Sequence, residues 1–248
     1  MTENGDGMQP WSTTKRLAKR VLEVTHVPWW VRQRGELRFH LKDTWRESSE
    51  FMTQSDALLR NWGYAPNDFA GLTVVDIGAG SRLRSLFFAE AKIVAIEPLA
   101  CEFMSRIEWC DLDHAAKVIA RPAEQPVPEL DRQAALVMCV NVLDHVSDPE
   151  ALLDNASRML ENRGQLLLSV DMHDGADYMH PIGLSADYLR SALLTRGLAV
   201  VREYYGLPHA PAYGHGAAYT VVASADATSM EPITSATARL ATPPHAAT

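Results

Sequence analysis

Apolar residues gather in short, nearly continuous runs through the middle of the chain, with amphipathic segments between them. Runs of this kind are typical of strands that are buried on both faces of a parallel sheet. The expected strands are LTVVDI (72–77), KIVAIEP (92–98), AKVIA (116–120), ALVMCVN (135–141) and QLLLSVDM (165–172). The expected helices between them are 82–91, 99–107 and 148–164. The alternation predicts an α/β domain with a doubly wound, mostly parallel sheet.

The last expected helix in this series has clear start and stop signals. Asp148 and Pro149 stand where a cap and a first-turn proline belong, and Gly164, the last residue of the segment, stands where the helix should stop. A further helix is expected over 185–196, followed by apolar runs at 198–207 and 217–225. We expect these two runs to add a closing antiparallel hairpin strand, which makes a seven-stranded sheet.

The N-terminal part of the chain predicts helices rather than strands. A helix is expected from Ser12, and a second over 49–62, where apolar side chains share one side and Gly63 suits a C-terminal cap. The expected organisation is a flexible N-terminus (1–11), a helical extension or lid (12–70), the main α/β domain (71–227) and a disordered, Ala/Thr/Pro-rich tail (228–248).

Charge and cysteine content narrow the class of protein. The chain has 248 residues and a net charge of −8, which argues against a nucleic-acid partner because such proteins usually carry a basic face. The three cysteines, Cys101, Cys110 and Cys139, have no C-x-x-C spacing, so we expect reduced thiols and a cytoplasmic location. No apolar run reaches the roughly 18 residues that a membrane span needs, and no secretory signal is expected.

The first apolar run ends in VVDIGAGSR, a pattern that predicts a cofactor loop. Gly78 and Gly80 carry no Cβ and allow the backbone to approach a ligand closely. A dinucleotide pattern would need a glycine at position 83, which is leucine here. Glu97 ends the second expected strand, where an acid can accept hydrogen bonds from ribose hydroxyls. The pattern therefore favours a nucleoside cofactor over a nicotinamide dinucleotide, and an ordinary tight turn is the alternative for the two glycines.

At this point the chain resembles the class I S-adenosylmethionine-dependent methyltransferases. The matching pieces are VVDIGAGSR, VAIEP, ARPAEQPVPE and MCVNVLDHVSDPEALLDNASRMLENRGQLLLSV, in this order over about residues 71–170. One departure is Arg82, where the family often has a third glycine. The resemblance implies a Rossmann-like methyltransferase fold with S-adenosylmethionine as cofactor. The cofactor-binding residues it implies are Asp76, Gly78, Ala79, Gly80, Glu97, Pro98, Ala123, Glu124 and Asn141.

Acidic and histidine side chains follow the fourth and fifth expected strands. His145 is the candidate base, next to Asp144, because a hydroxyl acceptor must lose its proton. Asp144, Asp171 and Asp174 could share a Mg²⁺ ion if the two strands are neighbours. This arrangement is similar to that of metal-dependent sugar O-methyltransferases, and the Ala/Thr/Pro-rich composition is similar to mycobacterial-type saccharide O-methyltransferases.

We therefore predict methylation of a sugar or polysaccharide-precursor hydroxyl with Mg²⁺ assistance. The alternatives are a metal-independent methyltransferase acting on a phenol, quinone, carbon or amine, and a non-catalytic cofactor-binding subunit. Asp148 is interpreted as a helix cap rather than a ligand. The expected partner is a small-molecule or oligosaccharide acceptor, and a homodimer is compatible with the sequence. Candidate acceptor-binding residues are Trp29, Trp30, His173, Tyr205, His209, Tyr213 and His215.

Overall fold

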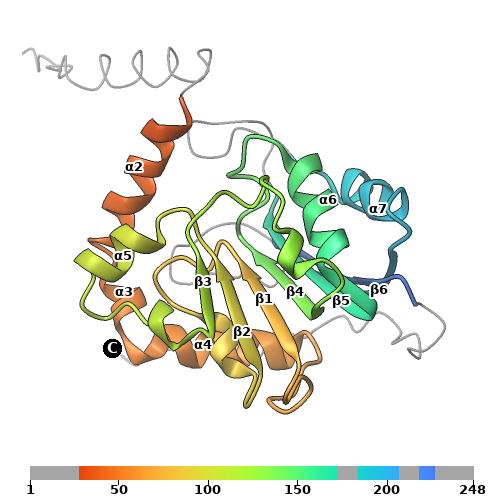
Figure 1. Cartoon of the computed structure of the whole chain (residues 1–248), viewed down its shortest axis with the longest axis horizontal. Coiled ribbons are helices and arrows are strands. Elements are labelled where there is room, and N and C mark those ends of the chain that lie inside the picture. The colour runs from red at the N-terminus through yellow and green to blue at the C-terminus, as the bar shows by residue number, and fades with distance from the viewer. Residues whose placement is uncertain (1–27, 173–183, 207–217, 227–248) are drawn as a thin grey trace, which may run out of the picture.

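The strands of the molecule form one mixed sheet. The computed structural model describes residues 28–172, 184–206 and 218–226 (Figure 1). The strand order is β3-β2-β1-β4-β5-β7-β6, and β7 is antiparallel to both neighbours while the other pairs are parallel. The strands are β1 (Thr73–Ile77), β2 (Lys92–Ile96), β3 (Lys117–Ile119), β4 (Ala134–Val140), β5 (Leu160–Asp171), β6 (Ala199–Tyr205) and β7 (Ala218–Ser224). The predicted doubly wound, mostly parallel seven-stranded sheet is confirmed.

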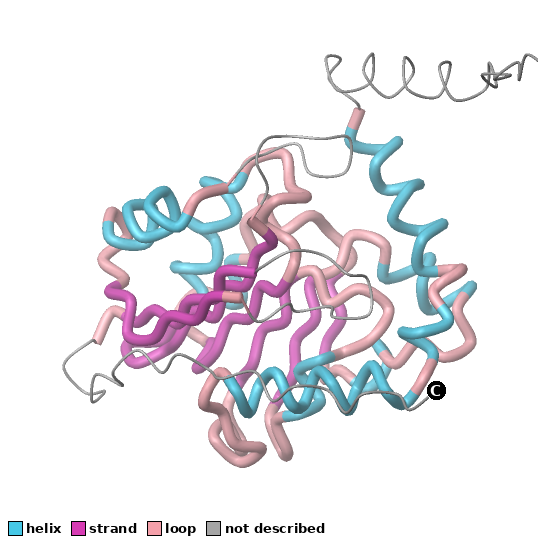
Figure 2. Tube along the Cα trace, turned by 180° about the vertical axis from the view of Figure 1, so that it is seen from behind, coloured by secondary structure: helices cyan, strands magenta, loops and turns pink. Residues whose placement is uncertain are grey.

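Alternate side chains of the central strands point to opposite faces of the sheet, as the pleat requires. Val75 and Val137 belong to the apolar cluster that α6 (Pro149–Met159) and α7 (Ala186–Leu194) cover. Val74 and Leu136 belong to the cluster that α4 (Ser49–Asn61) covers on the other face. Figure 2 shows the strands between these helices from behind. Both faces are buried, which explains why the strands read as continuous apolar runs.

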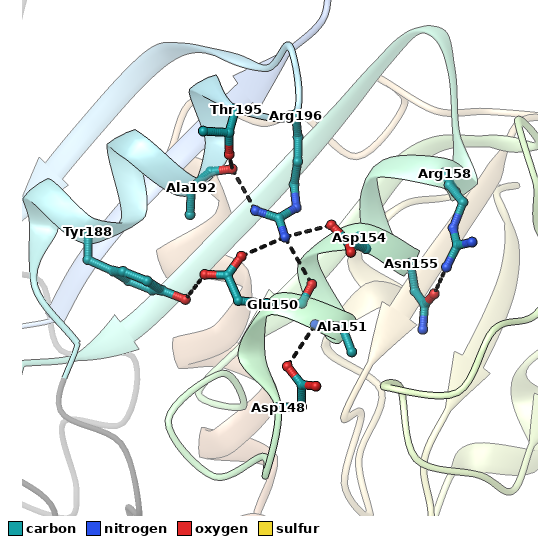
Figure 3. Close-up of polar contacts among 10 residues, drawn as sticks. All are labelled: Asp148, Glu150, Ala151, Asp154, Asn155, Arg158, Tyr188, Ala192, Thr195 and Arg196. Carbon is teal, nitrogen blue, oxygen red and sulfur yellow. Dashed lines mark hydrogen bonds and ion pairs between the residues drawn. The ribbon is translucent and has the colours of Figure 1, made fainter.

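Helices α6 and α7 are joined by a polar cluster around one guanidinium group (Figure 3). Arg196 lies just after α7, and its Nη2 atom is 2.7 Å from Oε2 of Glu150 and 2.6 Å from Oδ1 of Asp154, both on α6. The same guanidinium donates to the backbone oxygen of Ala192, 2.8 Å away. At the start of α6, the carboxylate of Asp148 accepts a hydrogen bond from the Ala151 N–H, so the predicted cap is confirmed.

The segment 82–91 is not the helix that its composition predicts. It contains only a short 3-10 helix, η1 (Arg84–Phe87), between two extended residues. The Leu83 N–H donates to Oδ1 of Asp111 at 2.7 Å, and the Ser85 hydroxyl donates to the carboxylate of Asp76 at 2.7 Å. Carboxylates from β1 and from the loop before η2 thus accept hydrogen bonds from this segment and hold it as a loop.

The helix expected over 148–164 is also shorter than predicted. It ends at Met159, and β5 begins at the next residue, so Gly164 lies within a strand instead of after a helix. The Gln133 N–H donates to the Met159 oxygen at 2.9 Å, and Leu160 pairs with Ala134 of β4. A Cβ at position 164 would lie 2.6 Å from the Ala134 oxygen, so close strand packing explains this glycine.

Three helices precede the sheet in the described part of the chain. They are α2 (Trp29–His40), α3 (Thr44–Glu47) and α4, while α5 (Ala100–Arg106) and the 3-10 helices η2 (Leu112–His114) and η3 (Pro128–Leu130) lie between strands. In Figure 1, α2 and α5 stand on the left, opposite α6 and α7. The helix predicted from Ser12 lies outside the described residues. Across 28–172, 184–206 and 218–226, no helix has the length and apolar character that crossing a bilayer requires.

Candidate active site

A cavity of about 510 Å³ lies at the carboxyl ends of β1, β2, β4 and β5, with α2 forming one wall. The chain connections diverge here to opposite sides of the sheet, which is where ligands bind in doubly wound folds. The volume is in the range of ligand pockets. All nine residues predicted to bind the cofactor line it: Asp76, Gly78, Ala79, Gly80, Glu97, Pro98, Ala123, Glu124 and Asn141. Their binding of the cofactor remains a prediction.

The glycine loop after β1 is shaped by backbone conformation and by close packing. Gly78 and Gly80 have φ values of 65° and 67°, in the left-handed region that other residues rarely adopt. A Cβ at residue 78 would lie 2.3 Å from a methyl carbon of Val142, and one at residue 80 would lie 2.8 Å from Cε1 of His40. The loop therefore needs glycine at both positions to pass between β4 and α2.

Two buried carboxyl groups stand at the ends of β1 and β2. The carboxylate of Glu97 accepts hydrogen bonds from the N–H groups of Gly80 and Leu99, at 3.0 and 2.9 Å. Burial raises the pKa of Glu97 to about 7, against the effect of these hydrogen bonds. Burial also raises the pKa of Asp76 to about 6, opposed by its hydrogen bonds with Ser85. Both groups can accept hydrogen bonds from a cofactor when ionised.

Asn141 follows β4 in an unusual backbone conformation. Its φ is 60°, and its N–H donates to the Ser169 oxygen at 2.7 Å. Its side-chain Oδ1 atom is buried and has no hydrogen-bond partner among the described residues. Buried polar groups are normally paired, so an orphaned oxygen on the cavity wall suits a ligand that donates to it. With the glycine loop and the two carboxyl groups, this set of acceptors fits an amino-acid-bearing nucleoside.

His145 lies in the cavity wall with carboxyl groups on both sides. Its Nδ1 atom is 3.3 Å from Oε1 of Glu36 on α2, and its Nε2 atom is 4.0 Å from Oδ2 of Asp144. Asp144 is fully buried behind the ring and does not line the cavity, whereas Asp171 at the end of β5 does. Burial lowers the pKa of His145, but the Glu36 hydrogen bond and the charges of Asp144 and Asp171 outweigh it and raise the pKa overall.

One face of α2 contacts two loops of the site. Arg32, Glu36 and His40 follow one another at four-residue spacing, which places them along one side of a helix. Arg32 donates to the His145 oxygen at 3.3 Å and to the Ser147 hydroxyl at 2.7 Å. The face therefore reaches the loop after β4 through Arg32 and Glu36, and the glycine loop through His40.

His40 is buried against the glycine loop. Its Nδ1 atom is 2.7 Å from the hydroxyl oxygen of Ser81, and its ring stacks on Phe103 of α5 with the centroids 4.5 Å apart. Burial, together with the charge of Arg46, holds the pKa of His40 well below its usual range. His40 is therefore neutral at physiological pH. It packs against the glycine loop and lines the cavity.

Few of the residues predicted to bind the acceptor line the cavity in the described part of the chain. Trp29 lines the cavity, but Trp30 is 56% exposed and is not among the lining residues. Tyr205 is 58% exposed and hydrogen-bonds Arg190, also away from the cavity wall. His173, Asp174, His209, Tyr213 and His215 lie outside the described residues. The described residues contain no group of three or more His, Cys, Asp or Glu side chains placed to hold a metal ion.

Several residues that line the cavity are not among those predicted from the sequence. They are Gln33, Glu36, Phe39 and His40 on α2, Arg46 on α3 and Arg84 on η1. In the predicted lid region, the candidate residues are the tryptophans Trp29 and Trp30. The polar residues at positions 32, 36 and 40 are not among the candidates. That i, i+4, i+8 pattern is the sequence signal that could have found the polar face of α2.

Comparisons with known proteins show that the chain is similar to methyltransferases. Residues 45–203, more than half of the chain, match the family model described as a methyltransferase domain. A ubiquinone biosynthesis O-methyltransferase from Pseudomonas paraeruginosa is 29% identical over 168 residues, which cover 64% of this chain and 70% of that protein.

Two solved structures show the same fold. The 1,6-didemethyltoxoflavin-N1-methyltransferase of Burkholderia thailandensis, solved with S-adenosylhomocysteine, has a TM-score of 0.52 and 16% identity, covering 89% of this chain and 92% of that chain. A SAM dependent methyltransferase from Aquifex aeolicus has a TM-score of 0.51 and 16% identity, covering 80% of this chain and 98% of that chain. At these identities the structures establish the shared fold alone.

Proposed function

The chain belongs to the methyltransferase domain family, and from this premise we propose that it methylates a hydroxyl group of a small aromatic acceptor. The enzyme is an S-adenosylmethionine (SAM)-dependent methyltransferase. The observation that carries this proposal is a histidine with carboxyl partners in the wall of the cofactor cavity.

Different residues of the cavity would bind different parts of SAM. Glu97 would accept hydrogen bonds from the ribose hydroxyls, and Asp76 would face the methionine amino group. Asn141 would accept a hydrogen bond through its orphaned Oδ1 atom. When bound, SAM supplies a methyl group that its sulfonium already activates. The protein therefore has to orient the acceptor, exclude water and remove a proton.

A hydroxyl acceptor requires a base, and the candidate base is His145. An alcohol or phenol must lose its proton on methylation, whereas an amine can attack through its lone pair. His145 takes this proton in our proposal, and the nearby carboxyl groups of Glu36 and Asp144 stabilise the imidazolium that forms. The Glu36 hydrogen bond and the charges of Asp144 and Asp171 raise the pKa of His145, which makes its neutral imidazole a stronger base. The proton then passes to water as the methyl ether leaves.

An aromatic acceptor suits the apolar part of the wall. Trp29, Phe39, Val142 and Val146 line the cavity near the polar groups. A phenol has a pKa near 10, well below that of a sugar hydroxyl, so one imidazole can deprotonate it. The relative from Pseudomonas paraeruginosa is named for O-methylation in ubiquinone biosynthesis, which is the same reaction type.

The saccharide acceptor and the Mg²⁺ ion stay predictions from the sequence. None of the proteins compared above is named for a saccharide substrate. His209, Tyr213, His215 and Asp174, on which those predictions depend, lie outside the described residues. Assays with and without a chelator test the metal: equal turnover in both removes it. The homodimer and the cytoplasmic location also stay predictions.

The proposal is tested with labelled methyl-SAM and a panel of catechols, simple phenols, monosaccharides and aromatic amines. We expect O-methylated phenolic products, identified by mass spectrometry. Transfer to amines or monosaccharides, with none to phenolic oxygen, would overturn the aromatic hydroxyl. We also expect His145→Ala to keep its affinity for S-adenosylhomocysteine while losing about 10²–10⁴-fold in kcat, the usual contribution of a general base. Turnover equal to wild type would remove His145 as the base.

A further inference from the structure

We propose that Glu36 of α2 is a positioning residue that holds His145 through its Nδ1 atom. This inference rests on the proposed function, because it concerns the same proton transfer. The Oε1 atom of Glu36 lies 3.3 Å from Nδ1 of His145. Both side chains are about three-quarters buried, at 25% and 22% exposure, so water screens their interaction only in part.

The docking of α2 explains why this carboxylate reaches a loop that follows β4. Arg32, one turn before Glu36, donates to the His145 oxygen and to the Ser147 hydroxyl. His40, one turn after Glu36, packs on the glycine loop and keeps its Nε2 atom 4.0 Å from Oε2 of Glu36. The Glu36 side chain is therefore fixed between two anchored positions of one helical face.

The contact at Nδ1 selects one form of the imidazole. A carboxylate at Nδ1 favours the proton on that nitrogen, and the basic lone pair then resides on Nε2. The Asp144 oxygen is 4.0 Å from Nε2, which is beyond hydrogen-bond length. Glu36 thus sets the tautomer, while Asp144 acts on the ring through its charge.

Within the described part of the chain, the charged groups around His145 come from three elements. Glu36 faces it from α2, Asp144 from its own loop and Asp171 from the end of β5, while Arg32 donates to its backbone oxygen. All three carboxyl groups favour the imidazolium. Glu36 is the one of these within hydrogen-bond range, so its removal should change the titration of His145 most.

The experiment compares Glu36→Gln with wild type in the full-length protein. Nuclear magnetic resonance of the His145 ring, assigned with His145→Ala, reads the pKa without any acceptor. We expect a fall of about 1–3 units in Glu36→Gln, the usual effect of losing an opposite charge at this range. With a phenolic acceptor, kcat should fall about tenfold or more, with unchanged affinity for S-adenosylhomocysteine, and the acidic limb of the pH–rate profile should move to lower pH.

Controls separate positioning from folding. Glu47→Gln removes the same charge from an exposed residue of α3 and should leave the His145 pKa and kcat unchanged. Glu36→Asp keeps the charge, and its His145 pKa should lie between those of wild type and Glu36→Gln. In Glu36→Gln/His145→Ala the loss in kcat should equal that of His145→Ala alone, because the two residues act as one unit.

An unchanged His145 pKa in folded Glu36→Gln would overturn the inference, whatever the acceptor. Additive losses in the double variant would overturn it as well. A lowered pKa in a protein that methylates no phenol would instead reject the proposed function and leave the pairing of Glu36 with His145 in place.

Discussion

The Glu97 carboxylate accepts a hydrogen bond of 3.0 Å from the Gly80 N–H, which joins the end of β2 to the glycine loop after β1. Its other oxygen accepts from the Leu99 N–H at 2.9 Å. Each carboxylate oxygen has a further lone pair that can accept from a ligand. One buried side chain therefore both shapes the cofactor loop and offers two acceptors to the cavity.

Glu97→Ala should weaken the binding of S-adenosylhomocysteine by about 1–3 kcal/mol, the scale of a lost hydrogen bond to a charged group. Calorimetry at pH 8 measures the change. Glu102→Ala, on the exposed side of α5, is the control and should bind as wild type. Unchanged affinity in Glu97→Ala would contradict the ribose assignment.

The affinity for the cofactor should also depend on pH through the same group. Burial raises the pKa of Glu97 to about 7, and only the ionised form offers both oxygens as acceptors. Affinity for S-adenosylhomocysteine should therefore fall as the pH drops from 8 to 6. In Glu97→Gln this part of the pH dependence should be absent. Parallel curves for the two proteins would show that another group titrates there.

Stability of the ligand-free protein should change with pH in the opposite direction. The pKa of Glu97 is about 7 in the folded state, against 4.5 as the ordinary value. Its contribution is thus fully present below pH 4.5 and is lost as the pH rises through about 7. Asp76, with a pKa of about 6, acts in the same direction at lower pH. Denaturant titrations should show a shallower fall for Glu97→Gln than for wild type between pH 5 and 8.

Gly78→Ala should destabilise the fold more than Gly71→Ala does. Both positions have left-handed φ values, 65° and 75°, so both substitutions carry a conformational cost of about 1–2 kcal/mol. Only at residue 78 would the new Cβ meet a neighbour, 2.3 Å from a methyl carbon of Val142. We expect about 1–3 kcal/mol of further loss there from overpacking. Equal urea midpoints for the two variants would show that the loop can move aside.

Arg196→Met should lower the free energy of unfolding by about 1 kcal/mol without changing cofactor affinity. Its side chain is only 11% exposed, while the carboxylates of Glu150 and Asp154 are more than half exposed. The loss therefore comes mainly from the part-buried hydrogen bond to the Ala192 backbone oxygen, which loses its donor. Asp154→Asn is the matched control and should stay within about 0.5 kcal/mol of wild type.

The sheet could be predicted from the sequence because its strands are buried on both faces. Short, continuous apolar runs of this kind are typical of such strands. The glycine loop could be predicted because its backbone tolerates few residue types. The loop over 82–91 could not, because its conformation depends on carboxylates at Asp76 and Asp111, which only the fold brings near. The four-residue spacing of Glu36 and His40 could have placed them on one helical face, but their partners follow β4 and β1, and only the fold brings these near.

The face of α2 that meets the site loops differs from the core of the sheet in the kind of contact that holds it. Arg32, Glu36 and His40 hold this wall by hydrogen bonds and charge, whereas the sheet is held by apolar packing. Water can replace polar contacts at a small net cost, but it cannot replace a hydrophobic core. The wall that α2 forms should therefore respond to pH and ionic strength more strongly than the apolar core of the sheet does.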